Sequence, residues 1–121
     1  MAKTALIVDD SRSLRQMVRD TLEGAGYCVE ESANGQDALA VADQRAIDFV
    51  ITDVNMPVMD GISFVQQLRS RKAFRFTPVL ILTTESTAAV KDQGRRAGAT
   101  GWMVKPFRPA QLLDVVAKIV S

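Results

Sequence analysis

The 121-residue sequence contains no histidine and a single cysteine, Cys28. Without histidine, the chain has neither a histidine catalyst of its own nor histidine ligands for a metal. One cysteine cannot form a disulfide within the chain. Because Cys28 falls in a strand-like segment, we interpret it as a buried core thiol.

The sequence also lacks an excess of charge of one sign, and it lacks long hydrophobic runs. The chain carries 15 Lys and Arg against 14 Asp and Glu, which gives a net charge of +1. A general nucleic-acid-binding protein usually has a strong basic excess, so that class is disfavoured. No hydrophobic run approaches the ~18 residues of a membrane-spanning helix, and the N-terminus lacks the hydrophobic segment of a signal peptide. We expect a cytoplasmic protein that binds neither nucleic acid nor membrane.

What the sequence does contain is an alternation of hydrophobic and amphipathic segments. Five hydrophobic segments have the β-branched composition of strands, at residues 4–8, 27–33, 48–54, 78–84 and 101–105. Most are nearly continuous in hydrophobicity, which is typical of parallel strands covered on both faces. Helical periodicity follows each of them, at residues 11–26, 34–45, 61–71, 85–99 and 109–120. Right-handed crossovers between such units predict an α/β fold, a doubly wound five-stranded parallel sheet with helices on both faces, in a single domain of residues 1–121.

Four of the predicted strands end in polar side chains. Asp9 and Asp10 come directly after the first hydrophobic run, and Asp53, Thr83 and Lys105 lie at the ends of the third, fourth and fifth. Ligands of such sheets bind outside the carboxyl ends of the strands, so we expect these groups to meet at one edge. A single aspartate at a strand end is more often a turn or helix cap. Five polar groups at one edge are hard to explain as caps.

The chemistry of this group is that of phosphoryl transfer. Clustered carboxylates without His or Cys suit a hard cation such as Mg²⁺. A lysine supplies a point charge for phosphate, and a threonine hydroxyl donates a hydrogen bond to it. Carboxylates also act as nucleophiles in phosphoryl transfer. We therefore interpret Asp9 and Asp10 as holding Mg²⁺ beside Asp53, which receives a phosphoryl group.

Four motifs carry these residues: VDDS, DVNMPVMDG, LTTES and GWMVKPF. They resemble the receiver domains of bacterial response regulators, and the similarity extends from Lys3 to the C-terminus. Within that family the chain most resembles the stand-alone chemotaxis regulators. The resemblance implies a flavodoxin-like sheet of order 2-1-3-4-5. It also implies that Asp53 is the phospho-acceptor, Thr83 the switch hydroxyl and Lys105 the phosphate-binding lysine, with a cis bond between Lys105 and Pro106.

The resemblance also implies the metal ligands and the residues that control phosphoryl lifetime. Asp10 and Asp53 would ligate Mg²⁺ directly, Asn55 through its backbone carbonyl and Asp9 through water. Asn55 and Glu85 would flank the path of the attacking water. Both are polar, so we predict a short-lived phosphoryl group.

The output surface implied by the resemblance comprises the fourth helix, the fifth strand and the fifth helix. Trp102 lies where the family usually has Tyr or Phe. Rotation of Trp102 on activation and static packing at the edge both remain open. Lys91 and Arg95 lie four residues apart and share a helix face, which the resemblance places near Trp102. Gly94 lowers the stability of that helix and so eases its displacement.

A phosphorylation switch needs a donor and a target. The donor histidine must belong to another protein, because this chain has none. The resemblance implies a CheA-like histidine kinase as donor, the flagellar motor switch or another target as output, and a possible phosphatase. We expect a monomer that is not an enzyme beyond its own phosphorylation and dephosphorylation. A phosphate sink or relay intermediate without flagellar output remains the alternative.

Three further interpretations depend on single features. A phosphatase of the haloacid dehalogenase type is disfavoured because it would usually have a second aspartate where this chain has Asn55. A flavin-binding protein is also disfavoured, because it would need a phosphate-binding loop after the first strand, where this chain has the acidic segment DDSRS. The basic residues Arg71, Lys72 and Arg75 are interpreted as a solvated face rather than a docking patch.

Overall fold

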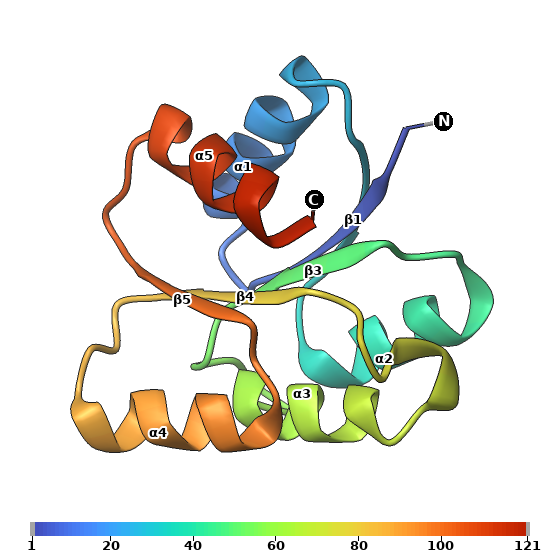
Figure 1. Cartoon of the computed structure of the whole chain (residues 1–121), viewed down its shortest axis with the longest axis vertical. Helices are drawn as coiled ribbons and strands as arrows, with labels where there is room; N and C mark the ends of the chain where they lie inside the picture. Colours follow the sequence, from blue (N-terminus) through green and yellow to red (C-terminus); the bar gives the residue numbers. More distant parts are fainter. Residues whose placement is uncertain (1, 121) are drawn as a thin grey trace.

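The computed structural model describes residues 2–120 and shows a parallel β-sheet between two layers of helices (Figure 1). The strands are β1 (Thr4–Val8), β2 (Cys28–Ser32), β3 (Phe49–Thr52), β4 (Val79–Thr83) and β5 (Gly101–Val104). They lie in the order β2-β1-β3-β4-β5, which confirms the predicted doubly wound α/β sheet. The register pairs Val8 with Thr52, so the residues that come after β1 and β3 emerge side by side.

Five α-helices cover the two faces of the sheet. Helices α1 (Arg12–Gly24) and α5 (Pro109–Val120) lie on one face, and α2 (Gly35–Gln44), α3 (Gly61–Arg69) and α4 (Ala88–Ala97) lie on the other (Figure 1). A short 3₁₀ turn, η1 (Lys72–Phe74), follows α3. Within residues 2–120, no helix combines the length and hydrophobicity needed to cross a membrane.

Side-chain caps define where the helices begin. The side chain of Asn34 accepts a hydrogen bond from the Asp37 N–H, and those of Ser11 and Asp60 cap α1 and α3 in the same way. The fourth helix starts at Ala88, later than its sequence pattern suggests, because Thr87 accepts a hydrogen bond from the Val90 N–H. Such caps satisfy amide groups that have no partner in the first turn.

The hydrophobic core consists of two layers, one on each face of the sheet. Alternate side chains of a strand point to opposite faces. Leu6 and Val8 therefore pack in the layer that includes residues of α2 and α3, whereas Ala5 and Ile7 pack in the layer that includes residues of α1 and α5. All four are at most 2% exposed. Burial of both faces accounts for the nearly continuous hydrophobicity of the strands.

Cys28 corrects one sequence-based prediction, because its side chain is exposed rather than buried. It is the first residue of β2, and β2 forms an edge of the sheet with a neighbour on one side only. The buried positions of that strand belong to Val29 and Ser32. A hydrophobic residue at the start of an edge strand can therefore remain in contact with solvent.

Candidate functional site

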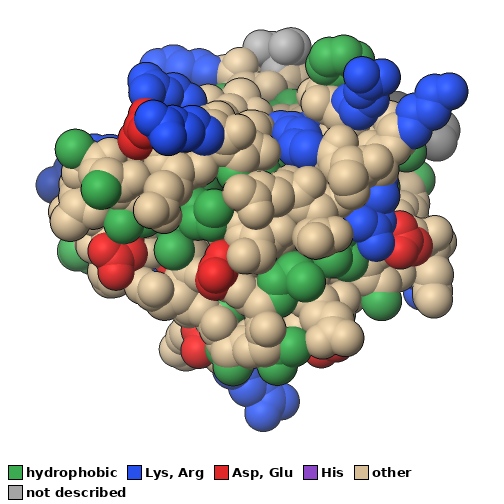
Figure 2. Space-filling model, turned by 90° about the horizontal axis from the view of Figure 1, so that it is seen from below, with side chains coloured by type: hydrophobic (Ala, Val, Ile, Leu, Met, Phe, Trp, Pro, Cys, Tyr) green, Lys and Arg blue, Asp and Glu red, His purple; other side chains and the backbone are tan. Residues whose placement is uncertain are grey.

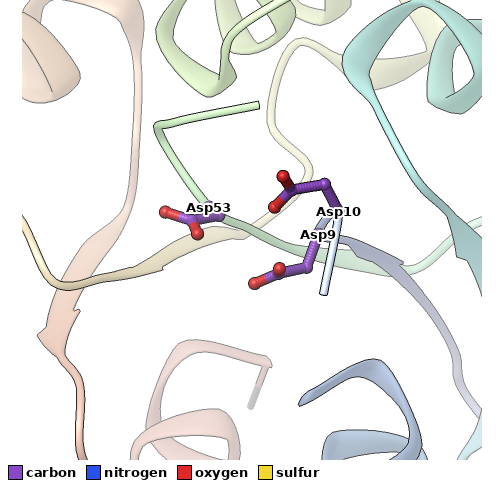
Figure 3. A group of neighbouring side chains, drawn as sticks. All are labelled: Asp9, Asp10 and Asp53. Atoms are coloured by element: carbon purple, nitrogen blue, oxygen red, sulfur yellow. The ribbon is translucent and has the colours of Figure 1, made fainter. Parts of the chain in front are cut away.

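Three carboxylates meet where β1 and β3 end. Asp9 and Asp10 follow β1, Asp53 follows β3, and one oxygen of each lies within 4.8 Å of the other two. All three carboxylates project to the same side (Figure 3). Asp9 and Asp53 are buried and Asp10 is exposed. Oxygen donors of this kind fit a hard divalent cation, which would relieve the repulsion between the carboxylates.

Lys105 partly neutralises the charge of these carboxylates. Its Nζ lies 2.9 Å from Asp9 Oδ2 and 2.9 Å from Asp53 Oδ2. Burial opposes the positive charge, but the two carboxylates outweigh burial and raise the pKa of Lys105. The Lys105–Pro106 peptide bond is cis, as the resemblance implied.

Asp9 and Asp10 differ in how far the protein already occupies their oxygens. Asp9 Oδ1 accepts a hydrogen bond from the Ser11 N–H at 2.8 Å, and Oδ2 accepts one from Lys105. Burial raises the pKa of Asp9, although the hydrogen bond from Lys105 acts in the opposite direction. In residues 2–120, Asp10 has no hydrogen bond or ion pair with the protein. Its carboxylate is therefore the freer of the two for direct ligation of a cation.

Asp53 is held by a hydrogen bond to each of its carboxylate oxygens and by the turn that follows it. Oδ1 accepts a hydrogen bond from the Val54 N–H at 2.6 Å, while Oδ2 faces Lys105. Gly61, the first residue of α3, packs directly on this backbone. A Cβ at Gly61 would lie 1.9 Å from the Asp53 carbonyl oxygen, so only glycine fits there. The sequence places Gly61 at the end of the DVNMPVMDG motif, but no pattern in it indicates a contact with Asp53.

Thr83 and Glu85 lie on the neighbouring strand β4 and the loop after it. Thr83 is fully buried, and its hydroxyl accepts a hydrogen bond from the Glu85 N–H at 3.3 Å. Among the described residues, this hydroxyl makes no hydrogen bond with Asp53. The structure therefore places Thr83 at the end of β4, with its hydroxyl bonded within its own loop.

Glu85 connects two groups that the sequence pattern leaves separate. The Asn55 amide Nδ2 donates to Glu85 Oε1 at 3.1 Å, and the Trp102 indole Nε1 donates to the Glu85 carbonyl oxygen at 3.1 Å. The two residues expected to control phosphoryl lifetime thus contact each other, and Glu85 also contacts Trp102, the aromatic residue of the predicted output surface. No sequence pattern indicates these contacts, because the three residues come from different loops and strands.

A groove between α4 and β5 brings together the residues of the predicted output surface. It has a volume of 620 Å³, and its lining includes Lys91, Arg95 and Trp102. Asp92 also lines it and forms ion pairs with Arg95 and Arg96. Figure 2 views the molecule from the side of α3 and α4, where Lys and Arg side chains lie mainly toward the periphery. The lining of the groove includes two cationic side chains, Lys91 and Arg95, and one anionic side chain, Asp92, so it carries more positive than negative groups.

Gly94 lies against the indole of Trp102. A Cβ at Gly94 would approach Trp102 Cζ3 to 2.7 Å and Ile81 Cδ1 to 3.0 Å. Besides lowering helix propensity, this glycine therefore leaves room for a large aromatic side chain beneath α4.

The basic cluster at the end of α3 is only partly solvated. Arg71 forms an ion pair with Asp43, with Nε 2.6 Å from Oδ1, whereas Lys72 and Arg75 are exposed. The hydrogen bonds from Arg71 hold the pKa of Asp43 below its usual range. One of the three cations therefore links the segment after α3 to α2.

Comparisons with known proteins identify similar chains. The family profile of the response regulator receiver domain matches residues 5–117. The structure of the chemotaxis response regulator CheY4 of Vibrio cholerae is 49% identical, with a TM-score of 0.94, and the match covers 98% of this chain and 99% of that one. The transcriptional regulatory protein ResD of Bacillus subtilis is 36% identical over 108 residues, which are 89% of this chain but only 44% of ResD.

A further similar structure contains a metal. The receiver domain of the sensor histidine kinase PA1611 from Pseudomonas aeruginosa is 25% identical, with a TM-score of 0.91 over 99% of this chain and 98% of that one. It was solved with a magnesium ion coordinated in the active site cleft.

Proposed function

Because this chain belongs to the response regulator receiver domain family, we propose that it is a phosphorylation-activated switch of a chemotaxis-type two-component system, with Asp53 as the phospho-acceptor. The observation that supports this most directly is the position of Asp53, which lies beside two other carboxylates and within hydrogen-bond distance of Lys105. In this proposal residues 1–121 act as one receiver domain in the cytoplasm, as a monomer.

The transfer proceeds by attack of a carboxylate oxygen of Asp53 on the phosphorus of a phosphohistidine. The O–P bond forms as the P–N bond breaks, and its electron pair returns to the imidazole of the donor. Lys105 remains positively charged and stabilises the negative charge of the transferred group. The Val54 N–H and the packing of Gly61 hold Asp53 in place. Such transfers depend on positioning and charge neutralisation more than on covalent chemistry by the protein.

Asp10, Asp53 and the Asn55 backbone carbonyl would hold Mg²⁺, with Asp9 acting through water. When bound, the ion supplies further positive charge beside the phosphoryl oxygens. The availability of the Asp10 carboxylate and the engagement of both Asp9 oxygens support this division of roles.

The donor belongs to a histidine kinase, since this chain lacks histidine, and the chemotaxis relative favours one of the CheA type. The target binds the surface formed by α4, β5 and α5, with the flagellar motor switch as the specific candidate. Lys91 and Arg95 beside the Trp102 groove suit a target segment with acidic groups around a hydrophobic anchor. Removal of the phosphoryl group by water, with or without a phosphatase, resets the switch.

The central test is phosphorylation by acetyl phosphate with Mg²⁺, monitored by mass spectrometry of the intact protein. Asp53→Asn should abolish the adduct, because an amide is a poor nucleophile. Asp10→Ala should reduce its formation at low Mg²⁺ by weakening metal binding. Asp20→Asn serves as the matched control, because Asp20 is an exposed carboxylate of α1 bonded to Gln16. An adduct that persists in Asp53→Asn would show that another residue is the acceptor.

The specific output needs a separate test. The protein loaded with beryllofluoride and Mg²⁺ should recover a flagellar switch component in a pull-down, and Lys91→Glu with Arg95→Glu should reduce that recovery. Recovery of a kinase alone would contradict the flagellar assignment and favour a phosphate sink or relay.

A further inference from the structure

The carbonyl oxygen of Asp9 is bound by a charged side chain that phosphoryl transfer does not use. Arg15, in the first turns of α1, donates from Nη1 to this carbonyl at 2.5 Å. The same guanidinium donates from Nε to Glu31 Oε1 at 3.1 Å. Its side chain is only 16% exposed. One planar group therefore joins the end of β1 to β2 through two hydrogen bonds.

Glu31 is itself held by two arginines of α1. Arg19 Nη1 donates to Glu31 Oε2 at 2.6 Å, so the carboxylate receives one guanidinium on each oxygen. Burial would raise the pKa of Glu31, but the hydrogen bonds from Arg19 and Arg15 hold it below its usual range. The ionised carboxylate keeps the Arg15 fork in one orientation.

The position of this contact matters for the metal site. The Asp9 carbonyl belongs to the peptide unit that joins Asp9 to Asp10, so a donor bound to it restricts rotation of that peptide. The carboxylates of both residues project from the two ends of this unit (Figure 3). Groups that orient metal ligands in this way affect metal affinity without touching the ion.

We propose that Arg15, oriented by Glu31, is a positioning residue that holds the Asp9–Asp10 turn ready for a divalent cation. The proposal rests on the metal site described under Proposed function. It leads to an expectation opposite in sign to simple electrostatics. Removal of a cation near carboxylates should strengthen Mg²⁺ binding through the charge alone, whereas loss of an orienting contact should weaken it.

Three variants separate the contact from the charge. Arg15→Lys keeps the charge, but an ammonium lacks the planar fork that reaches the Asp9 carbonyl and Glu31 together. Arg15→Gln removes both the charge and the fork. Arg19→Gln is the matched control, because it also removes one cation from α1 and one ion pair with Glu31, but no contact with Asp9.

Mg²⁺ affinity is measured by isothermal titration calorimetry on the full chain without a phosphodonor. Arg15→Lys and Arg15→Gln should each weaken binding by about tenfold, the lower end for groups that orient metal ligands. Arg19→Gln should remain close to wild type. Unchanged or tighter binding in Arg15→Lys would overturn the proposal. Failure of wild type to bind Mg²⁺ would instead overturn the metal site itself.

A second measurement needs no metal. The Ser11 N–H is bonded to Asp9 Oδ1, so its hydrogen exchange, measured without added Mg²⁺, reports on the order of this turn. Exchange of this amide should be faster in Arg15→Lys than in wild type or Arg19→Gln, while amides of β3 keep their protection. Equal exchange of the Ser11 amide in Arg15→Lys and Arg19→Gln would contradict a positioning role.

Discussion

Substitution of Gly94 by alanine tests which effect of this glycine is larger: the lower helix propensity that it gives α4, or the room that it leaves for the indole of Trp102. Helix propensity alone predicts that Gly94→Ala stabilises the protein by about 1 kcal/mol. The structure predicts the opposite, because the new Cβ would lie 2.7 Å from Trp102 Cζ3, 3.0 Å from Ile81 Cδ1 and 3.2 Å from Trp102 Cε3. Ordinary contacts begin at 3.4 Å, so the ring or the helix must move.

The size of the effect depends on these two opposing contributions. An extra methyl group in a packed region costs about 1–3 kcal/mol. Against a gain of about 1 kcal/mol in helix propensity, Gly94→Ala should lower the free energy of unfolding by about 0–2 kcal/mol. If the indole swings outward instead, the hydrogen bond to the Glu85 carbonyl is lost, which costs about 0.5–1.5 kcal/mol.

The assay is urea denaturation monitored by circular dichroism, with Gly94→Ala made in wild type and in Trp102→Phe. Phenylalanine lacks the outer ring of the indole, so that background relieves the contacts with Trp102 and leaves the 3.0 Å contact with Ile81 Cδ1. The alanine should therefore be less destabilising there than in wild type, with a gain of about 1 kcal/mol as the upper limit. The emission of Trp102 in the single variant shows whether the indole becomes more exposed. Equal stabilisation in both backgrounds, with unchanged emission, would refute the packing argument.

Three further predictions concern lifetime, switching and pH. Asn55→Met should slow loss of the phosphoryl group after acetyl phosphate is removed, because a bulky apolar side chain shields the acyl phosphate; a wild-type adduct stable for hours would contradict the predicted short lifetime. Beryllofluoride with Mg²⁺ should change the fluorescence of Trp102 beyond the effect of Mg²⁺ alone, and Thr83→Ala should reduce that change; identical responses would exclude coupling between hydroxyl and indole. Hydrogen bonds from Arg19 and Arg15 outweigh burial and lower the pKa of Glu31 below 4.5. The stability that the ionised carboxylate contributes is therefore present above pH 4.5 and is lost as the pH falls through the lowered pKa. Urea midpoints from about pH 6 to about pH 3 should therefore fall less steeply in Glu31→Gln, and equal slopes would contradict this.

The fold and the composition of the site were predictable because both depend on local patterns. Hydrophobic runs such as Thr4–Val8 indicate strands by their own composition, and Asn34 marks a helix start by its own capping chemistry. Parallel strands bring the residues beyond their carboxyl ends to one edge, so Asp9, Asp53 and Lys105 are brought together once the order of the sheet is known.

Contacts between side chains from different elements were not predictable. Asn55 and Glu85 are 30 residues apart, so their hydrogen bond depends on how two separate loops approach each other. The closeness of Gly94 to Trp102 and the exposure of Cys28 likewise depend on packing distances and on which strand lies at the edge.

Periodicity and residue chemistry thus predict which groups this chain brings to the end of its sheet, because each strand carries its own terminal residues. Distances of a few ångströms decide the rest. Arg15 appears in the sequence as one more arginine of an amphipathic helix, and only the folded chain places its guanidinium on the Asp9 carbonyl, because a helix, two strands and the turn between them must pack before that contact exists.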